Sequence, residues 1–290
     1  MNYRLITDAT ADLTLEMTLG LPDIAVIPME IVIEEIPYQY GPGGNITVDE
    51  FYAELRKGKF SSTSQVNPMT YEDFFVPFLE AGEDILYLCF TSGMSGMYQN
   101  AKQCTERLQK QFPERKIICI DTKCASLGEG FLVREALIKQ ANGASMEELV
   151  QWVYDNQIRI CQWFTVDTFE HLKHGGRVSS TAAAIGTALQ IKPLLHVSGD
   201  GELEVVDRTV RGTKRAINAL LERFEKGWQS HQCNRIIVGH GGCPDVAEKL
   251  AWEIQNKYPY ANIIVAPIGP IIGSHTGPGM LGVVFWGQER

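Results

Sequence analysis

The 290-residue chain is poor in positive charge and in the motifs of common nucleotide- and metal-dependent enzymes. Its 26 Lys and Arg are outnumbered by 35 Asp and Glu, a formal net charge of −9, whereas nucleic acids and anionic membranes attract cationic surfaces. The P-loop pattern G-x-x-x-x-G-K-[ST] and the zincin pattern H-E-x-x-H are absent. We therefore expect no nucleic acid partner, no metal site and no cofactor.

The cysteines and the first residues bear on the cellular compartment. The 7 cysteines are scattered and no two form C-x-x-C, so neither a disulfide framework nor a zinc ribbon is predicted. Asp8 appears before any signal-peptide core could be complete. We expect a cytoplasmic protein with reduced thiols.

The uncharged segment from Asn262 to Gln288 is long enough to cross a bilayer. Three prolines and six glycines within it would break a membrane helix. We expect a buried, irregular segment that forms part of a site, and no stable membrane insertion.

The first half of the chain alternates buried strands with helices. Continuous apolar runs predict strands over Tyr3–Thr7, Ile85–Phe90 and Lys116–Ile120. Capping residues predict helices that begin near Thr47, Asn67, Ser95, Ser126 and Ser145. Pro77 should kink or shorten the second of these helices. This βαβα order predicts a parallel, doubly wound sheet.

The pattern changes near residue 160. It predicts a strand over Cys161–Val166, a hairpin with Asp200-Gly201 at its tip, and then helices and strands as far as Pro267. The antiparallel component indicates a second α/β domain with a mixed sheet.

Three clusters rich in Ser, Thr, Gly and His are the candidate binding residues. They are Ser61-Ser62-Thr63-Ser64-Gln65, the stretch from Thr91 to Tyr98 that follows a central strand, and the predicted loop from Gly273 to Gly279 that carries His275. Hydroxyls, backbone N–H groups and an imidazole suit the oxygen atoms of an anion better than a metal or paired-carboxylate catalysis. Each cluster also has a structural interpretation, as a polar loop, a capped glycine turn or a core histidine.

A nucleophile elbow is one alternative for the second cluster. Gly93-Met94-Ser95 begins as the elbow of an acyl hydrolase does, with Ser95 as nucleophile and His275 as base. The fifth elbow position is Met97 instead of Gly, and no acid visibly orients His275. We therefore expect no catalytic residue, with a serine acyl hydrolase and a regulatory module for another small anion as the alternatives.

The motifs together resemble the DegV family, whose members bind a fatty acid and, in characterised cases, hand it to a separate fatty acid kinase. The matching residues run in family order over almost the whole chain: Thr7-Asp8 with Asp12, Thr63-Ser64-Gln65, Ser92-Gly93-Met94-Ser95-Gly96, Gly175-Gly176-Arg177, Ile191-Lys192-Pro193 and His275-Thr276-Gly277-Pro278-Gly279. Val66 and Asn67 replace the Pro-Ser that the family usually carries there, and Met replaces Leu and Thr around Ser95. None of these departures removes a hydroxyl or the imidazole.

The resemblance implies an architecture and a binding site. An N-terminal Rossmann-like domain, residues 1–160, would be followed by a C-terminal α/β domain, residues 161–290, from which residues 269–282 return to the ligand site. The acyl chain of a long-chain fatty acid would lie between the domains. The residues that would hold its carboxylate are Thr63, Ser95 and His275, supported by Ser64, Gly96 and Thr276.

The resemblance also implies a protein partner, a fatty acid kinase. Arg177, on the Gly-Gly-Arg loop, would contact this kinase or the acyl-phosphate. Arg208 and Arg211 are further candidates for the same contact, on their charge alone.

Overall fold

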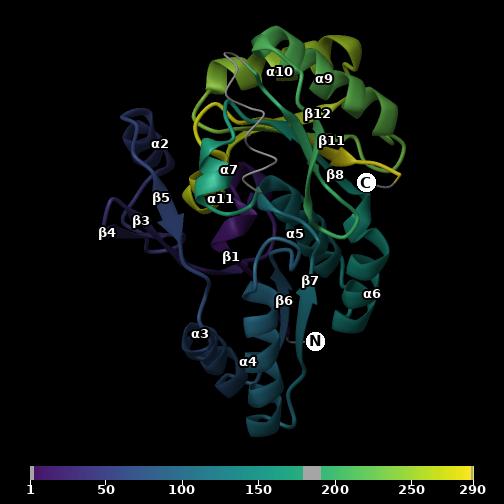
Figure 1. Ribbon diagram of the computed structural model, residues 1–290. Helices are drawn as coiled ribbons and strands as arrows, with labels where there is room; N and C mark the ends of the chain where they lie inside the picture. The colour runs from purple at the N-terminus through teal and green to yellow at the C-terminus, as the bar shows by residue number, and fades with distance from the viewer. Residues whose placement is uncertain (1–2, 179–190, 289) are drawn as a thin grey trace.

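The computed structural model describes residues 3–178, 191–288 and 290. Its described helices and strands form a mixed α/β architecture built on three sheets, as the sequence predicts for the fold class (Figure 1). Two of the sheets are large, and the long helix α5 (Ser126–Ala141) lies between them.

The first sheet is parallel and carries the predicted strands of the N-terminal half. In the order of the sheet, its strands are β2 (Ala25–Ile27), β1 (Tyr3–Asp8), β6 (Asp84–Cys89) and β7 (Ile117–Asp121). From β1 the chain proceeds to β2 on one side, and from β6 to β7 on the other. The carboxyl ends of β1 and β6 therefore form a switch point, where open α/β sheets bind ligands.

The second sheet is mixed and has six strands. In sheet order they are β10 (Leu203–Asp207), β9 (Leu194–Val197), β8 (Ile160–Thr165), β13 (Leu281–Trp286), β11 (Arg235–His240) and β12 (Asn262–Pro267). Helices α9 (Gly212–Gly227) and α10 (Pro244–Lys257) cover its outer face (Figure 1). Its inner face packs on α5 and is directed toward the first sheet.

A third, antiparallel sheet was not predicted. It consists of β4 (Ile36–Tyr40), β3 (Met29–Ile33) and β5 (Ser61–Thr63). Glu34 and Glu35 turn β3 into β4 with positive φ angles of 45° and 73°, a conformation that usually selects Gly or Asn. The interpretation of Ser61–Thr63 as a plain polar loop is wrong, because these residues pair with β3.

Four of the remaining helices begin close to the predicted residues: α2 (Val48–Arg56), α3 (Pro68–Glu80), α4 (Met97–Gln111) and α6 (Met146–Asn156). The shorter helices are η1 (Ala9–Ala11), α1 (Leu15–Thr18), η2 (Gln157–Arg159), α7 (Glu170–His174) and α11 (Pro270–Thr276). Both predicted capping boxes, Thr47 with Glu50 and Ser145 with Glu148, are confirmed.

Pro77 does not shorten α3, which continues to Glu80. The buried side chains of Tyr71, Phe75 and Leu79 fall at i, i+4 and i+8 and hold one face of the helix against the core. Pro77 lies on the exposed side, where water can bond the carbonyl that a proline leaves without its helical partner.

The uncharged segment 262–288 is regular rather than irregular. It forms β12, α11 and β13, and all six residues of β13 are buried in the second sheet. Within the described ranges no helix combines the length and apolarity that crossing a membrane requires.

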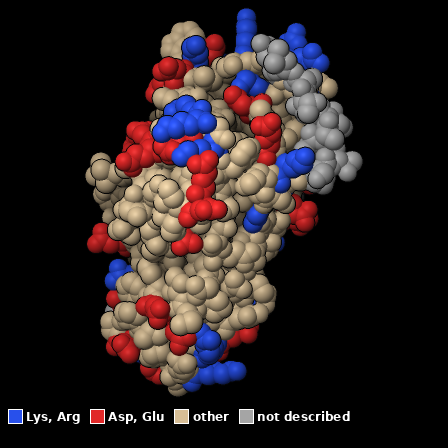
Figure 2. Space-filling model, turned by 60° about the vertical axis from the view of Figure 1, so that its left-hand side comes forward, with Lys and Arg blue, Asp and Glu red and all other residues tan. Residues whose placement is uncertain are grey.

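Charged side chains contribute little to holding this fold together. Figure 2 shows acidic and basic residues interspersed over one face of the molecule. Many of their pairs are solvent-exposed, as for Lys116 with Glu147 and Lys226 with Glu222. Exposed pairs of this kind contribute at most about 1 kcal/mol each, so the three buried apolar clusters dominate the stability.

Candidate functional site

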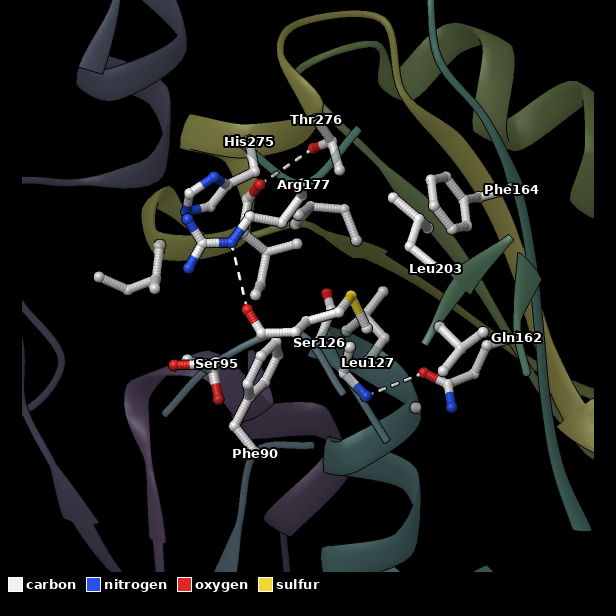
Figure 3. A pocket seen from close by; sticks show the side chains of 18 of the residues that line it. Phe90, Ser95, Ser126, Leu127, Gln162, Phe164, Arg177, Leu203, His275 and Thr276 are labelled. Atoms are coloured by element: carbon white, nitrogen blue, oxygen red, sulfur yellow. Dashed lines mark hydrogen bonds between the residues drawn. The ribbon is translucent and has the colours of Figure 1, made fainter. Parts of the chain in front are cut away.

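A cavity of about 280 Å³ lies between the carboxyl ends of β1 and β6 and the inner face of the six-stranded sheet. Figure 3 shows its two sides: Ser95, Arg177 and His275 on one, and Phe164, Leu203 and Gln162 on the other. The polar residues that line it are Thr10, Thr63, Ser64, Gln65, Ser95, Ser126, Gln162, Arg177, His275 and Thr276.

The first and third sequence clusters meet at this cavity. Because side chains alternate along a strand, Ser61 and Thr63 of β5 point to the same side, toward α11. The Oγ of Ser61 donates to the Oγ of Ser274 over 2.8 Å, and the Oγ1 of Thr63 lies 3.0 Å from Nε2 of His275. A short edge strand and a short helix thus place a hydroxyl and an imidazole side by side.

His275 is held as a neutral imidazole. Burial, with the positive charge of Arg177 and a smaller effect of His174, lowers its pKa to about 4. Its Nδ1 is buried and has no hydrogen-bond partner among the described residues. A Cβ atom on Gly175 would come within 2.0 Å of that Nδ1, so the ring edge opposite to Thr63 faces the Gly175 backbone.

His275 lies on a helix, which corrects the prediction of a loop. Helix α11 has Pro270 at its first turn and Gly277, with φ of 73°, just beyond its end. Pro at the start and Gly after the end are the usual helix boundaries, so the sequence did carry the signal. The glycine spacing from Gly277 to Gly282 matches a dinucleotide fingerprint, but it leads from a helix into a strand, the reverse of that motif.

The second cluster divides between two roles. Thr91 Oγ1 donates to the carbonyl of Gly201 in the β9–β10 hairpin, and Ser92 bonds Asp121. Only the later residues reach the cavity: Ser95 lines it, and its Oγ accepts the N–H of Met97. Gly96, the residue before α4, lies against the Gln65 amide and is not among the described lining residues.

Ser64 and Thr276 also line the cavity, and the hydroxyl of Thr276 donates to the carbonyl of Ile272. Arg177 lines it as well, and its guanidinium donates to the carbonyls of Met94 and Gly175. Burial lowers the pKa of Arg177. The structure thus brings six of the nine expected site residues to one cavity.

Arg208 and Arg211 lie elsewhere, on the connection between β10 and α9. Neither is among the described residues that line the cavity, and Arg211 is exposed.

Sequence reasoning noted Asp8 only as part of a family motif and did not single out Glu129 or Thr10, which are buried polar residues beside the cavity. Asp8 and Glu129 are fully buried, and burial raises the pKa of both carboxyls, with their mutual repulsion adding to it for Glu129. Thr10 lines the cavity and bonds both carboxyls. Among the described residues, no group of three His, Cys, Asp or Glu side chains is placed to hold a metal.

Gln162 was missed as well. Its side chain is 5% exposed on the apolar side of the cavity, and its Oε1 accepts the N–H of Ala125 at the start of α5 over 3.0 Å. Gln162 is the only amide within the mostly apolar run from Ile160 to Val166, and this is the signal that could have singled it out.

Comparison with known proteins places this geometry in context. The family model described as "Uncharacterised protein, DegV family" matches residues 2–288. A DegV domain-containing protein of Clostridium perfringens is 39% identical over 288 residues, 99% of this chain and 98% of the relative.

Two solved structures are also similar over nearly the full length. A DegV family protein from Thermus thermophilus, described by its fatty acid binding, is 29% identical with a TM-score of 0.84 over 99% of this chain and 100% of that chain. DegV from Bacillus subtilis, described as a fatty acid binding protein, is 26% identical with a TM-score of 0.84 and the same coverage.

Proposed function

Because the chain belongs to the DegV family, we propose that it binds a long-chain fatty acid in the cavity between its two large sheets. The observation that carries this proposal is the division of one cavity into a side with hydroxyls and an imidazole and an opposite, largely apolar side (Figure 3). Thr63 and Ser95 would donate to the carboxylate, His275 would help to hold it by orienting the Thr63 hydroxyl, and Ser64 and Thr276 lie beside them.

The energetics favour an amphipathic ligand. Burying an alkyl chain of about sixteen carbons contributes on the order of 10 kcal/mol at roughly 0.8 kcal/mol per CH₂, before ordering costs. Burying a carboxylate without partners would remove much of that gain. The hydroxyls of Thr63 and Ser95 are the groups that offset it, because bonds to a charged acceptor are stronger than neutral ones.

The position of Nδ1 suggests how these donors are oriented. Since Nδ1 of His275 faces the Gly175 backbone, the ring presents Nε2 to Thr63. With the proton on Nε2, His275 donates to the Oγ1 of Thr63, and the hydroxyl proton of Thr63 is then free to be donated to the ligand carboxylate. The same arrangement commits the imidazole to Thr63 instead of Ser95, which a serine hydrolase would require as its base partner.

Thermal unfolding of delipidated protein tests the ligand class. At palmitate or oleate concentrations near 100 times the Kd, binding adds about 2.7 kcal/mol, which raises the Tm by roughly 4–5 °C in a chain of this size. Native mass spectrometry of protein purified from cells should show a co-purifying fatty acid. A Tm that is unchanged with fatty acid but rises with a short anion would favour the regulatory anion-binding module instead.

We further propose that the protein is a cytoplasmic, non-catalytic carrier that presents the carboxylate to a fatty acid kinase and then holds the acyl-phosphate. The absence of a fixed cation bonded directly to Thr63 or Ser95 among the described residues supports it, since the carboxylate must stay able to accept a phosphoryl group. We assign the two domains to residues 1–160 and 161–290, a boundary that falls directly after the first residue of β8, Ile160.

Replacing Arg177 tests the kinase contact. Arg177→Ala is expected to keep fatty-acid binding within about tenfold, because Thr63 and Ser95 retain their donors, and to lose phosphorylation when a fatty acid kinase and ATP are supplied. Arg177→Lys, which keeps the charge without the planar fork, is the matched variant. A folded Arg177→Ala protein that no longer binds fatty acid would place the guanidinium in the carboxylate site.

A further inference from the structure

The inner face of the six-stranded sheet has a gap in its side chains where it lines the cavity. Gly239 of β11 and Gly282 of β13 stand directly opposite each other in the antiparallel register, and both line the cavity. Glycine in the interior of a central strand is unfavourable and usually marks a place where another group approaches the backbone closely. Two such residues side by side leave room for neighbouring apolar side chains to lie close to the backbone: Leu127 and Ile268 lie within 3.1 Å of the Cβ position of Gly239, and Met280 lies within 3.1 Å of that of Gly282.

Bulky side chains surround this gap. On β8, Phe164 pairs with Gly282, and along β13 the next residue on the same face is Val284. At the other end Ile268 and Leu127 close the row beyond Gly239. The gap is therefore a short trench with apolar walls.

The trench lies across the cavity from the residues that are expected to hold the carboxylate. Figure 3 places Phe164, the strand neighbour of Gly282, across the cavity from Ser95, Arg177 and His275. Gln162, the polar residue nearby, is withdrawn from the trench, because its amide oxygen is bonded to the Ala125 N–H and Gly128 leaves the space for it. The surface that remains available there is apolar.

Resting on the proposed fatty-acid ligand, we propose that Gly239 and Gly282 receive the methyl end of the acyl chain and set the greatest chain length that the cavity accepts. A methyl group on either residue would push the neighbouring apolar side chains into the trench and so shorten it. A Cβ on Gly239 would come within 2.7 Å of Leu127 Cδ1, and a Cβ on Gly282 within 3.1 Å of Met280 Cε and 3.2 Å of Phe164 Cβ. Each substitution removes about one methylene of room.

Competition among saturated acids of twelve to twenty carbons, read by native mass spectrometry of delipidated protein, tests this. In Gly239→Ala and Gly282→Ala we expect the amount of the longest bound acid, relative to the amount of the acid two carbons shorter, to fall about fourfold. This fold-change corresponds to the loss of room for one CH₂, at roughly 0.8 kcal/mol. Gly199→Ala is the control, because Gly199 lies in open space with no atom within 4 Å of its Cβ position. The distribution of bound acids over chain length in Gly199→Ala should match that of the wild type.

Leu127→Ala keeps the test decisive if the glycine variants do not fold. Removing the side chain nearest to Gly239 enlarges the same end of the cavity, so the distribution is expected to move toward longer acids. An unchanged distribution in folded Gly239→Ala or Gly282→Ala, or in Leu127→Ala, overturns the assignment of the trench. If the wild type binds none of the acids, the proposed function itself fails, which is a separate result.

Discussion

At pH 7, Glu129→Gln is expected to be more stable than the wild type by about 2 kcal/mol, whereas Glu129→Ala is expected to lose roughly 3–5 kcal/mol. The reason is a count of protons. The Oγ1 of Thr10 lies 2.5 Å from Asp8 Oδ1 and 2.9 Å from Glu129 Oε2, and the Oγ1 of Thr7 lies 3.0 Å from the Leu88 carbonyl and 3.1 Å from Glu129 Oε1. Each hydroxyl has one proton, and neither a carbonyl nor a carboxylate can donate. The two hydroxyl protons serve two of these four contacts, and a proton on Glu129 serves a third, which an ionised Glu129 could not.

The pH dependence follows from the same proton. Burial and the nearby Asp8 raise the pKa of Glu129 well above its ordinary value, so the folded protein keeps a neutral acid that ionises when the chain unfolds. The stability that this provides is present below the unfolded pKa and is lost as the pH rises, by up to about 1.4 kcal/mol per pH unit. Burial raises the pKa of Asp12 to about 7, so Asp12 adds a further loss of folding stability as the pH rises, and this loss is complete near pH 7.

Urea unfolding of the three proteins at pH 5, 7 and 9 measures this effect. Glu129→Gln keeps the shape and can donate from its amide, so its advantage over the wild type should be small at pH 5 and grow with pH. Glu129→Ala leaves the hydroxyls of Thr7 and Thr10 buried with fewer partners and should be destabilised at every pH. A Gln variant that is less stable than the wild type at pH 7 would mean that Glu129 is ionised in the folded protein.

The parts of the fold that depend on local pattern could be predicted from the sequence. Residues that are close together in the sequence determine the buried strands β1, β6 and β7 and the capping boxes of α2 and α6. The three-stranded sheet could not be predicted from the sequence, because its turn at Glu34-Glu35 uses residues that rarely adopt positive φ. In addition, β5 is a strand only through its pairing with β3.

The site shows the same division between local and long-range information. Three clusters at strand and helix ends could be found from composition, since Ser, Thr, Gly and His seldom gather without a reason. That Thr63 meets His275 depends on a contact between residues 212 positions apart. The burial of Asp8 and Glu129 depends likewise on α5 packing over the end of β1, which no local pattern encodes. Local patterns thus predict which residues are candidates, and tertiary packing decides which of them share a site.

His275→Ala is expected to weaken fatty-acid binding by roughly ten- to a hundredfold, the equivalent of about 1.5–3 kcal/mol for a hydrogen bond to a charged group. Without the imidazole, the Oγ1 of Thr63 loses the partner at 3.0 Å that orients its hydroxyl toward the ligand. Displacement of a fluorescent fatty acid measures the loss, with folding checked by thermal unfolding.

Replacing His275 by Gln or by Asn distinguishes which ring nitrogen supports fatty-acid binding. His275→Gln places an N–H near the position of Nε2 and should retain most of the affinity, whereas His275→Asn, which mimics Nδ1, should resemble the alanine variant. Because His275 acts through Thr63, Thr63→Val combined with His275→Ala should bind no more weakly than Thr63→Val alone, while Ser95→Ala should add its own loss. If Asn preserves binding and Gln does not, then Nδ1 is the donor and the carboxylate lies on the Gly175 side of the ring. If neither His275→Ala nor Thr63→Val changes the affinity, the carboxylate is held elsewhere in the cavity.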